Sequence, residues 1–104
     1  MPTPEGKTKA KIRRELKKLA CLYDFWPVPT GYGKRTLDIL LCAGGWFIAI
    51  EAKKKDGELT GAQEITAAEI RAAHGLVFLV NDDKSLFLAM ETIKACCNLA
   101  KEIR

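Results

Sequence analysis

The stretch TLDILLCAGGWFIAIEAK, residues 36–53, decides the fold. It contains two apolar runs rich in β-branched and aromatic residues, with Gly44 and Gly45 between them. Because such residues favour strands and glycine adopts the positive φ that a tight hairpin needs, the stretch predicts two antiparallel strands at 36–42 and 46–53. The turn between them is expected at 43–45.

Three charged side chains interrupt this apolar hairpin: Asp38, Glu51 and Lys53. Side chains alternate along a strand, so Glu51 and Lys53 share one face. Asp38 lies at a similar distance from the turn as Glu51, which predicts that the two carboxylates are opposite or diagonal. Carboxylates that meet in this way repel unless a cation lies between them, and Mg²⁺ is typically bound by one or two carboxylates with water and phosphate.

The flanking segments predict helices around a sheet. Helical spacing of apolar residues predicts a helix over 8–21 after a loose tail at 1–7, and an extended run over 23–28 predicts a short strand. The capping-box pair Thr60 and Gln63 predicts a helix over 60–74 that ends at Gly75, and the apolar run 76–80 predicts a strand parallel to 46–53. A last helix is expected from residue 81 to the C-terminus. The chain is therefore expected to be one mixed α/β domain over 1–104, with a mixed sheet flanked by helices in the order α-β-β-β-α-β-α.

Composition and charge narrow the class of partner. The 104-residue chain carries a formal net charge of +4, and its basic residues gather at 7–18 and around the acidic pair. A polyanion such as nucleic acid fits this distribution, although a basic helix can also be merely solvated. The candidate DNA-binding residues are Tyr32, Lys34, Arg35, Lys54 and Lys55.

The remaining signals concern the compartment. No apolar run is long enough to span a membrane, and no apolar signal segment opens the chain, which predicts a cytoplasmic protein without a membrane partner, as in a bacterial or phage-infected cell. The four cysteines lack zinc-knuckle spacing and are expected to be reduced, buried thiols, with Cys42 in a core strand. His74 is expected to be a solvated residue at a helix end.

Taken together, these features resemble a known family. Gly33 and Asp38, the Glu51-Ala52-Lys53 tripeptide, the helix opened by Gln63, and Gly75 followed by the strand at 77–80 are similar to the VRR-Nuc domain of the PD-(D/E)xK nuclease superfamily. That superfamily includes restriction endonucleases and Holliday-junction resolvases. Where the family usually has Pro before the Asp and Gly two residues further back, this chain has Leu37 and Arg35.

The resemblance implies a restriction-endonuclease-like core and a Mg²⁺- or Mn²⁺-dependent DNA endonuclease. Its substrate would be branched, flap or junction DNA in replication or repair, and the enzyme would act as a homodimer. By resemblance, Asp38 and Glu51 bind the metal with the Ala52 carbonyl, Lys53 positions or activates water, and Gln63 steadies the site. Glu15 is the candidate acid from the first helix. The chemistry agrees, because a metal ion and a lysine can neutralise the charge that develops on phosphate oxygens during hydrolysis.

Other interpretations of the same residues stay open. The chain can be a nucleic-acid-binding module without catalysis, or Asp38, Glu51 and Lys53 can form a buried ion-pair cluster with a structural role. Gln63 can serve only as a helix cap, and Tyr32 can cap the core from a turn. Glu15 can pair with a lysine on its own helix.

Overall fold

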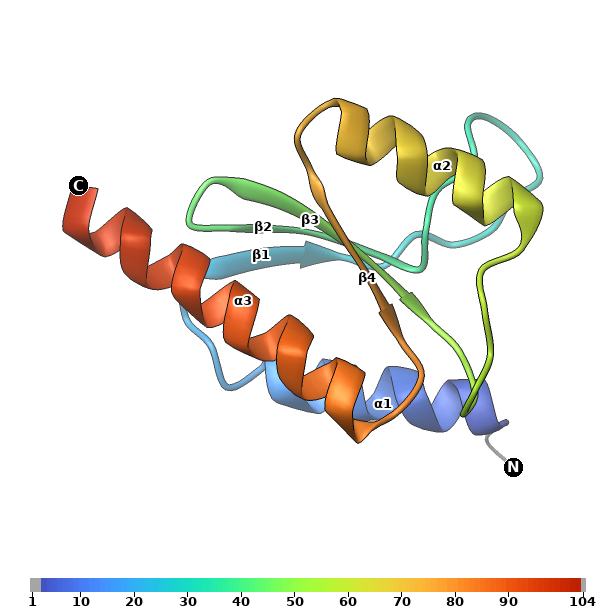
Figure 1. The fold of residues 1–104 in the computed structure, drawn as a ribbon, viewed down its shortest axis with the longest axis horizontal. Coiled ribbons are helices and arrows are strands. Elements are labelled where there is room, and N and C mark those ends of the chain that lie inside the picture. The colour runs from blue at the N-terminus through green and yellow to red at the C-terminus, as the bar shows by residue number, and fades with distance from the viewer. Residues whose placement is uncertain (1–2, 104) are drawn as a thin grey trace.

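The computed structural model describes residues 3–103, which form a four-stranded sheet and three helices (Figure 1). The sheet order is β1-β2-β3-β4; β1, β2 and β3 are antiparallel neighbours, and β4 is parallel to β3. In chain order the elements are α1 (Pro4–Leu16), β1 (Leu22–Phe25), β2 (Ile39–Ala43), β3 (Trp46–Ala52), α2 (Gly61–Ala72), β4 (Leu76–Val80) and α3 (Asp83–Ile103). The predicted mixed α/β class is therefore confirmed.

The central hairpin forms as predicted, although β2 begins at Ile39 and not at residue 36, and the turn is shorter. Gly44 and Gly45 alone connect β2 to β3, and their φ angles of 58° and 90° lie in the region that favours glycine. Ile39 pairs with Ile50 in this hairpin. The next rung beyond that pair therefore holds Asp38 opposite Glu51.

Helices cover the two faces of the sheet unequally. In Figure 1, α2 lies above the sheet, whereas α1 and α3 lie below it. The main core lies between the sheet and the α1–α3 pair and includes Ile12, Ile39, Ile48, Ile50 and Ile93, all at most 1% exposed. Because Ile50 points into this core, strand alternation directs its neighbour Glu51 to the face that carries α2.

The first helix begins earlier than predicted. Thr3 Oγ1 accepts a hydrogen bond from the Gly6 amide at 2.9 Å, and Pro4 occupies the first turn of α1. A threonine cap followed by proline is a helix start, so the prediction of a loose tail is wrong for residues 4–7. Residues 1–2 of that tail lie outside the described residues. The helix also ends at Leu16 and not at residue 21.

Two further helix predictions need correction. The residue with positive φ after α2 is His74, at 67°, whereas Gly75 was expected in that position. Gly75 instead allows close packing, since a side chain there would collide with Ile70 and press on Phe47. The last helix, α3, begins at Asp83, two residues later than predicted.

The cysteine prediction is wrong for three of the four residues. Cys21 and Cys97 form a disulfide that joins the start of β1 to α3, with Cα atoms 5.9 Å apart. Cys42 is exposed, because its side chain points away from the main core, to the face of the sheet that α2 covers only in part. Cys96 is a buried free thiol, as expected. Among residues 3–103, no helix is both long enough and apolar enough to cross a membrane.

Candidate metal centre

Asp38 and Glu51 meet at the end of the central hairpin, as the sequence predicts. The Asp38 backbone amide donates to Glu51 Oε1 at 3.0 Å, and the Ala52 amide donates to Asp38 Oδ2 at 3.0 Å. These reciprocal bonds tie each carboxylate to the backbone of the opposing segment. Both carboxylates therefore have fixed positions before any ligand binds.

Gln63 and Lys53 complete the surroundings of Glu51. Gln63 Nε2 donates to Glu51 Oε2 at 3.0 Å, while Gln63 Oε1 accepts from the Thr60 amide at 2.9 Å and closes the capping box of α2. Lys53 Nζ lies 3.8 Å from Glu51 Oε2, with only 15% of its side chain exposed. The predicted grouping of these side chains is present in the structure.

The first helix adds two charged groups that sequence reasoning missed. Carboxylate oxygens of Glu5, Asp38 and Glu51 all lie within 4.8 Å of one another. Lys9, one turn after Glu5 on the same helix face, places Nζ 3.5 Å from Asp38 Oδ1. The signal that could have revealed Glu5 is the Thr3-Pro4 helix start, which puts Glu5 in the first turn of a helix.

Glu15, the acid expected from this helix, does not join the cluster. It lies ten positions beyond Glu5, which corresponds to about 15 Å along an α-helix, and it pairs with Lys18. The structure therefore confirms the alternative interpretation, in which Glu15 forms a salt bridge with a lysine on its own helix segment.

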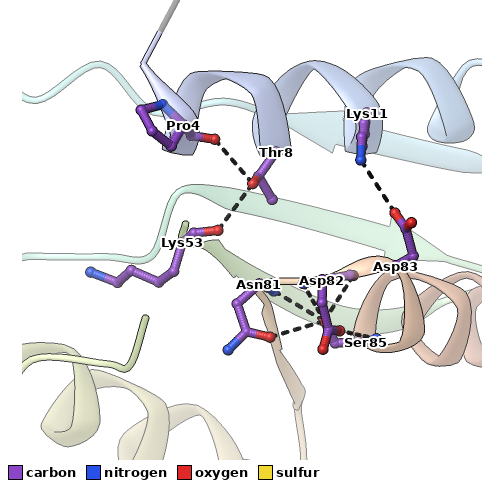
Figure 2. A network of polar contacts seen from close by, with 8 residues as sticks. All are labelled: Pro4, Thr8, Lys11, Lys53, Asn81, Asp82, Asp83 and Ser85. Atoms are coloured by element: carbon purple, nitrogen blue, oxygen red, sulfur yellow. Dashed lines mark hydrogen bonds and ion pairs between the residues drawn. The ribbon is translucent and has the colours of Figure 1, made fainter. Parts of the chain in front are cut away.

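The backbone of Lys53 is anchored through its amide and through its carbonyl, and Figure 2 shows the carbonyl contact with Thr8. Its amide donates to the Val80 carbonyl at 2.9 Å, which extends the β3–β4 pairing by one residue. Its carbonyl accepts from Thr8 Oγ1 at 3.0 Å, so α1 packs directly on the segment that carries the lysine. These contacts fix the backbone of Lys53 at the end of β3, on the strand that carries Glu51.

Burial and like charge act together on Glu51. Its residue exposure is 3%, and desolvation, together with the neighbouring Asp38 carboxylate, raises the pKa of Glu51 from 4.5 to about 7. Lys53 acts in the opposite direction but does not cancel these effects. An additional positive charge between the carboxylates would stabilise the ionised form.

The donor set fits a hard divalent cation. Three carboxylates offer oxygen atoms, and Mg²⁺ and Mn²⁺ both suit carboxylate, carbonyl and water ligands. The two lysines on the rim, Lys9 and Lys53, currently provide the positive charge. The Ala52 backbone amide donates a hydrogen bond to Asp38 Oδ2, and the role of the Ala52 carbonyl as a metal ligand stays a prediction.

The candidate DNA-binding residues are distributed over two regions. Tyr32 is 89% exposed in the 26–38 segment, so it does not cap the core, and Lys34 there pairs with Glu69 of α2 at 3.1 Å. Lys34 and Arg35 line a pocket of about 480 Å³ beside Phe47 and α2. Lys54 and Lys55 are exposed just after β3, and Lys55 lines a second pocket of about 340 Å³ with Lys7 and Lys11.

Comparison of the chain with protein-family models, with curated proteins and with solved structures found no match in any of the three. The functional interpretation therefore rests on the geometry of the site and on the residues that carry it.

Proposed function

We propose that this protein is a Mg²⁺- or Mn²⁺-dependent nuclease with a VRR-Nuc-like, restriction-endonuclease-like core. The observation that carries the proposal is the convergence of three carboxylates within 4.8 Å of one another, with the Lys53 ammonium 3.8 Å from Glu51. Fixed oxygen ligands beside a lysine suit hydrolysis of a phosphodiester, in which negative charge develops on the phosphate oxygens.

Each residue takes a defined role in this proposal. Glu5, Asp38 and Glu51 would hold the metal, with the Ala52 carbonyl as a further ligand. The bound metal would supply a Lewis acid and lower the pKa of a coordinated water molecule. Lys53 would orient the attacking water and offset charge on the phosphate, and Gln63 would hold Glu51 in position through its amide group.

The basic surface supports DNA as the substrate. Lys54 and Lys55 directly follow the strand that carries the site, and the chain as a whole has a net charge of +4. A symmetric homodimer would bring two sites to one branched, flap or junction DNA, because two-fold symmetry presents the same surface of each copy to the substrate. A cytoplasmic role in replication or repair is part of the same proposal.

The direct test is cleavage of labelled flap, junction, single-stranded and linear duplex DNA by the purified chain with Mg²⁺, with Mn²⁺ and with EDTA. We expect cleavage that needs metal and disappears in Asp38→Asn and Lys53→Met. Glu64→Gln, which changes an exposed acid on α2, and Lys84→Met, which changes an exposed lysine on α3, serve as matched controls with parental activity. The nuclease proposal fails if no substrate is cut, or if the site variants cut as well as their controls.

A second candidate is a nucleic-acid-binding module without catalysis. Its support is that Lys9 and Lys53 already pair with Asp38 and Glu51, so the carboxylates are partly neutralised without metal. This candidate expects salt-dependent DNA binding that is identical with Mg²⁺ and with EDTA, and no cleavage. A binding titration in both buffers separates the two candidates.

A further inference from the structure

The face of the sheet that carries Glu51 continues away from the metal centre as a row of aromatic side chains. Pairing across the strands aligns Tyr23, Cys42 and Phe47 in one row, and it aligns Phe25 with Leu40 in the next row toward the site. The rung beyond holds Asp38 and Glu51. Successive rows on one face are two residues, or roughly 7 Å, apart. We call Tyr23, Phe25, Leu40, Cys42 and Phe47 the aromatic platform.

The aromatic platform is open to solvent. Tyr23 is 73% exposed, Phe25 54% and Phe47 46%, and Cys42 is exposed between them. The helix on this side, α2, packs over β3 and β4, where Ala49 and Ala67 are fully buried. Within residues 3–103, no helix covers the β1–β2 half of this face.

Charge beside the platform indicates which partner it suits. Lys34 and Arg35 line the 480 Å³ pocket whose wall includes Phe47. Glu69 lines it too and pairs with Lys34 at 3.1 Å, so Arg35 carries the net positive charge at this edge of the platform. Aromatic side chains flanked by cations are the combination that binds single-stranded nucleic acid, because bases stack on the rings while the cations contact phosphates. Duplex DNA offers no such free base faces along its length.

A second copy of the chain fits this surface less well. A stable protein interface uses about 20 to 30 residues on each side, whereas the platform has five side chains. The platform instead lies on the same face of the sheet as the carboxylates at which a phosphate is proposed to bind.

We propose that the aromatic platform stacks the unpaired bases of a DNA strand whose phosphate backbone continues to the metal centre. The direction of the strand rests on the proposed nuclease function, but the stacking does not. The substrate class is therefore DNA with a single-stranded segment next to the cleavage point, such as a flap or a splayed junction arm.

The test measures binding without cleavage. Fluorescence anisotropy in EDTA compares a labelled oligothymidylate with a blunt duplex for the parent and for Tyr23→Leu/Phe25→Leu. Leucine keeps an apolar side chain but removes the ring face. The matched control Tyr23→Phe/Phe25→Tyr keeps both rings, and Leu88→Ala removes an exposed apolar group from α3. Circular dichroism checks folding, and Phe25→Leu alone replaces the double variant if the latter fails to fold.

We expect the leucine variant to bind oligothymidylate at least about fivefold more weakly, within the roughly 5- to 150-fold loss that follows removal of a stacking ring. Both controls and all duplex affinities should remain at the parental value. The proposal that the platform stacks bases is overturned if the parent and the leucine variant bind oligothymidylate equally well, or if the parent does not bind it. Loss of a dimer on light scattering, with unchanged DNA affinity, would assign the face to a second copy and also overturn it.

The outcomes separate this inference from the proposed function. Asp38→Asn should lose cleavage yet keep oligothymidylate affinity. If the parent never cleaves but the leucine variant binds weakly, the platform stands and the nuclease proposal fails. If the parent cleaves and the leucine variant binds normally, the nuclease stands and the platform fails.

Discussion

Replacing Glu51 by Gln distinguishes a functional site from a structural ion pair, because the two interpretations give opposite signs for the change in stability. Burial and Asp38 raise the pKa of Glu51 from 4.5 to about 7. The folded protein therefore holds a proton between these pH values that the unfolded chain has released. Stability consequently falls as the pH rises from 4.5 to 7, and above pH 7 the ionised Glu51 destabilises the fold by about 3 kcal/mol.

Glutamine removes that penalty but fits the contacts less well. Glu51 accepts bonds from the Asp38 amide and from Gln63 Nε2, and a glutamine side chain can accept only one of them. Losing one bond costs about 1 kcal/mol, so the metal-free variant should be about 2 kcal/mol more stable than the parent at pH 8. For a domain of this size that is a rise in Tm of roughly 8 to 16 °C.

The assay is a pair of thermal melts in EDTA at pH 8 and at pH 4.5, with Glu64→Gln as the exposed control. The gain for Glu51→Gln should be largest at pH 8 and should disappear near pH 4.5, where Glu51 of the parent is protonated in the folded state and half protonated in the unfolded state, so that almost none of the penalty remains. A buried structural pair with Lys53 predicts the reverse, a loss of about 3 to 5 kcal/mol at pH 8. That loss would refute the reasoning for a functional carboxylate.

Three further predictions concern metal, charge and the disulfide. At a Mg²⁺ concentration tenfold above its Kd, the parent should gain about 1.4 kcal/mol in stability, while Asp38→Asn should gain almost nothing in the same melts. Lys9→Met removes the amine 3.5 Å from Asp38 Oδ1, so calorimetry should show tighter Mg²⁺ binding, with Lys7→Met as the control; weaker binding would mean that Lys9 supports the site. Cys97→Ser opens a link across 76 residues, and denaturant unfolding without reductant should show a loss of about 4 kcal/mol, against little change for Cys42→Ser.

The disulfide does not agree with the predicted cytoplasmic location. Disulfides persist in oxidising compartments and are rare in the cytosol, where thiols are kept reduced. The spacing of Cys21 and Cys97 gives no sign of their pairing, because only the packing of α3 against the start of β1 brings them together. Their contact is a property of the tertiary structure, and the pattern of residues along the sequence does not predict it.

The centre of the fold was predictable because its signals are local. Gly44 and Gly45 determine the hairpin, and the hairpin register alone brings Asp38 opposite Glu51. The strand at 76–80 was predicted with its exact bounds, because a continuous apolar run bounded by Gly75 and Asn81 has few alternatives. Glu5 was missed because the start of α1 depends on a single cap and a proline, without an apolar stripe in its first turn.

The open aromatic platform was not predictable for a different reason. Alternation places Tyr23 and Phe25 on one face of their strand, but it does not say whether a helix covers that face. Coverage depends on the width of the sheet and on where α2 packs, and α2 protects only the β3–β4 half. The pattern of alternation therefore predicts which side chains share a face, but only the assembled sheet shows that these aromatic side chains are exposed.

Gln63 shows how a structural signal and a functional signal can occupy one residue. Its carbonyl oxygen caps the Thr60 amide, which fixes the side chain at the start of α2. Because that oxygen is engaged, the amide nitrogen must point away from the cap, and it donates to Glu51 Oε2. The helix cap and the contact with Glu51 are thus two consequences of one orientation of the Gln63 side chain. A variant such as Gln63→Glu would test this coupling, since it preserves the acceptor for the cap but places a negative charge against Glu51; we expect α2 to remain folded by circular dichroism while the site loses stability and metal-free Tm falls.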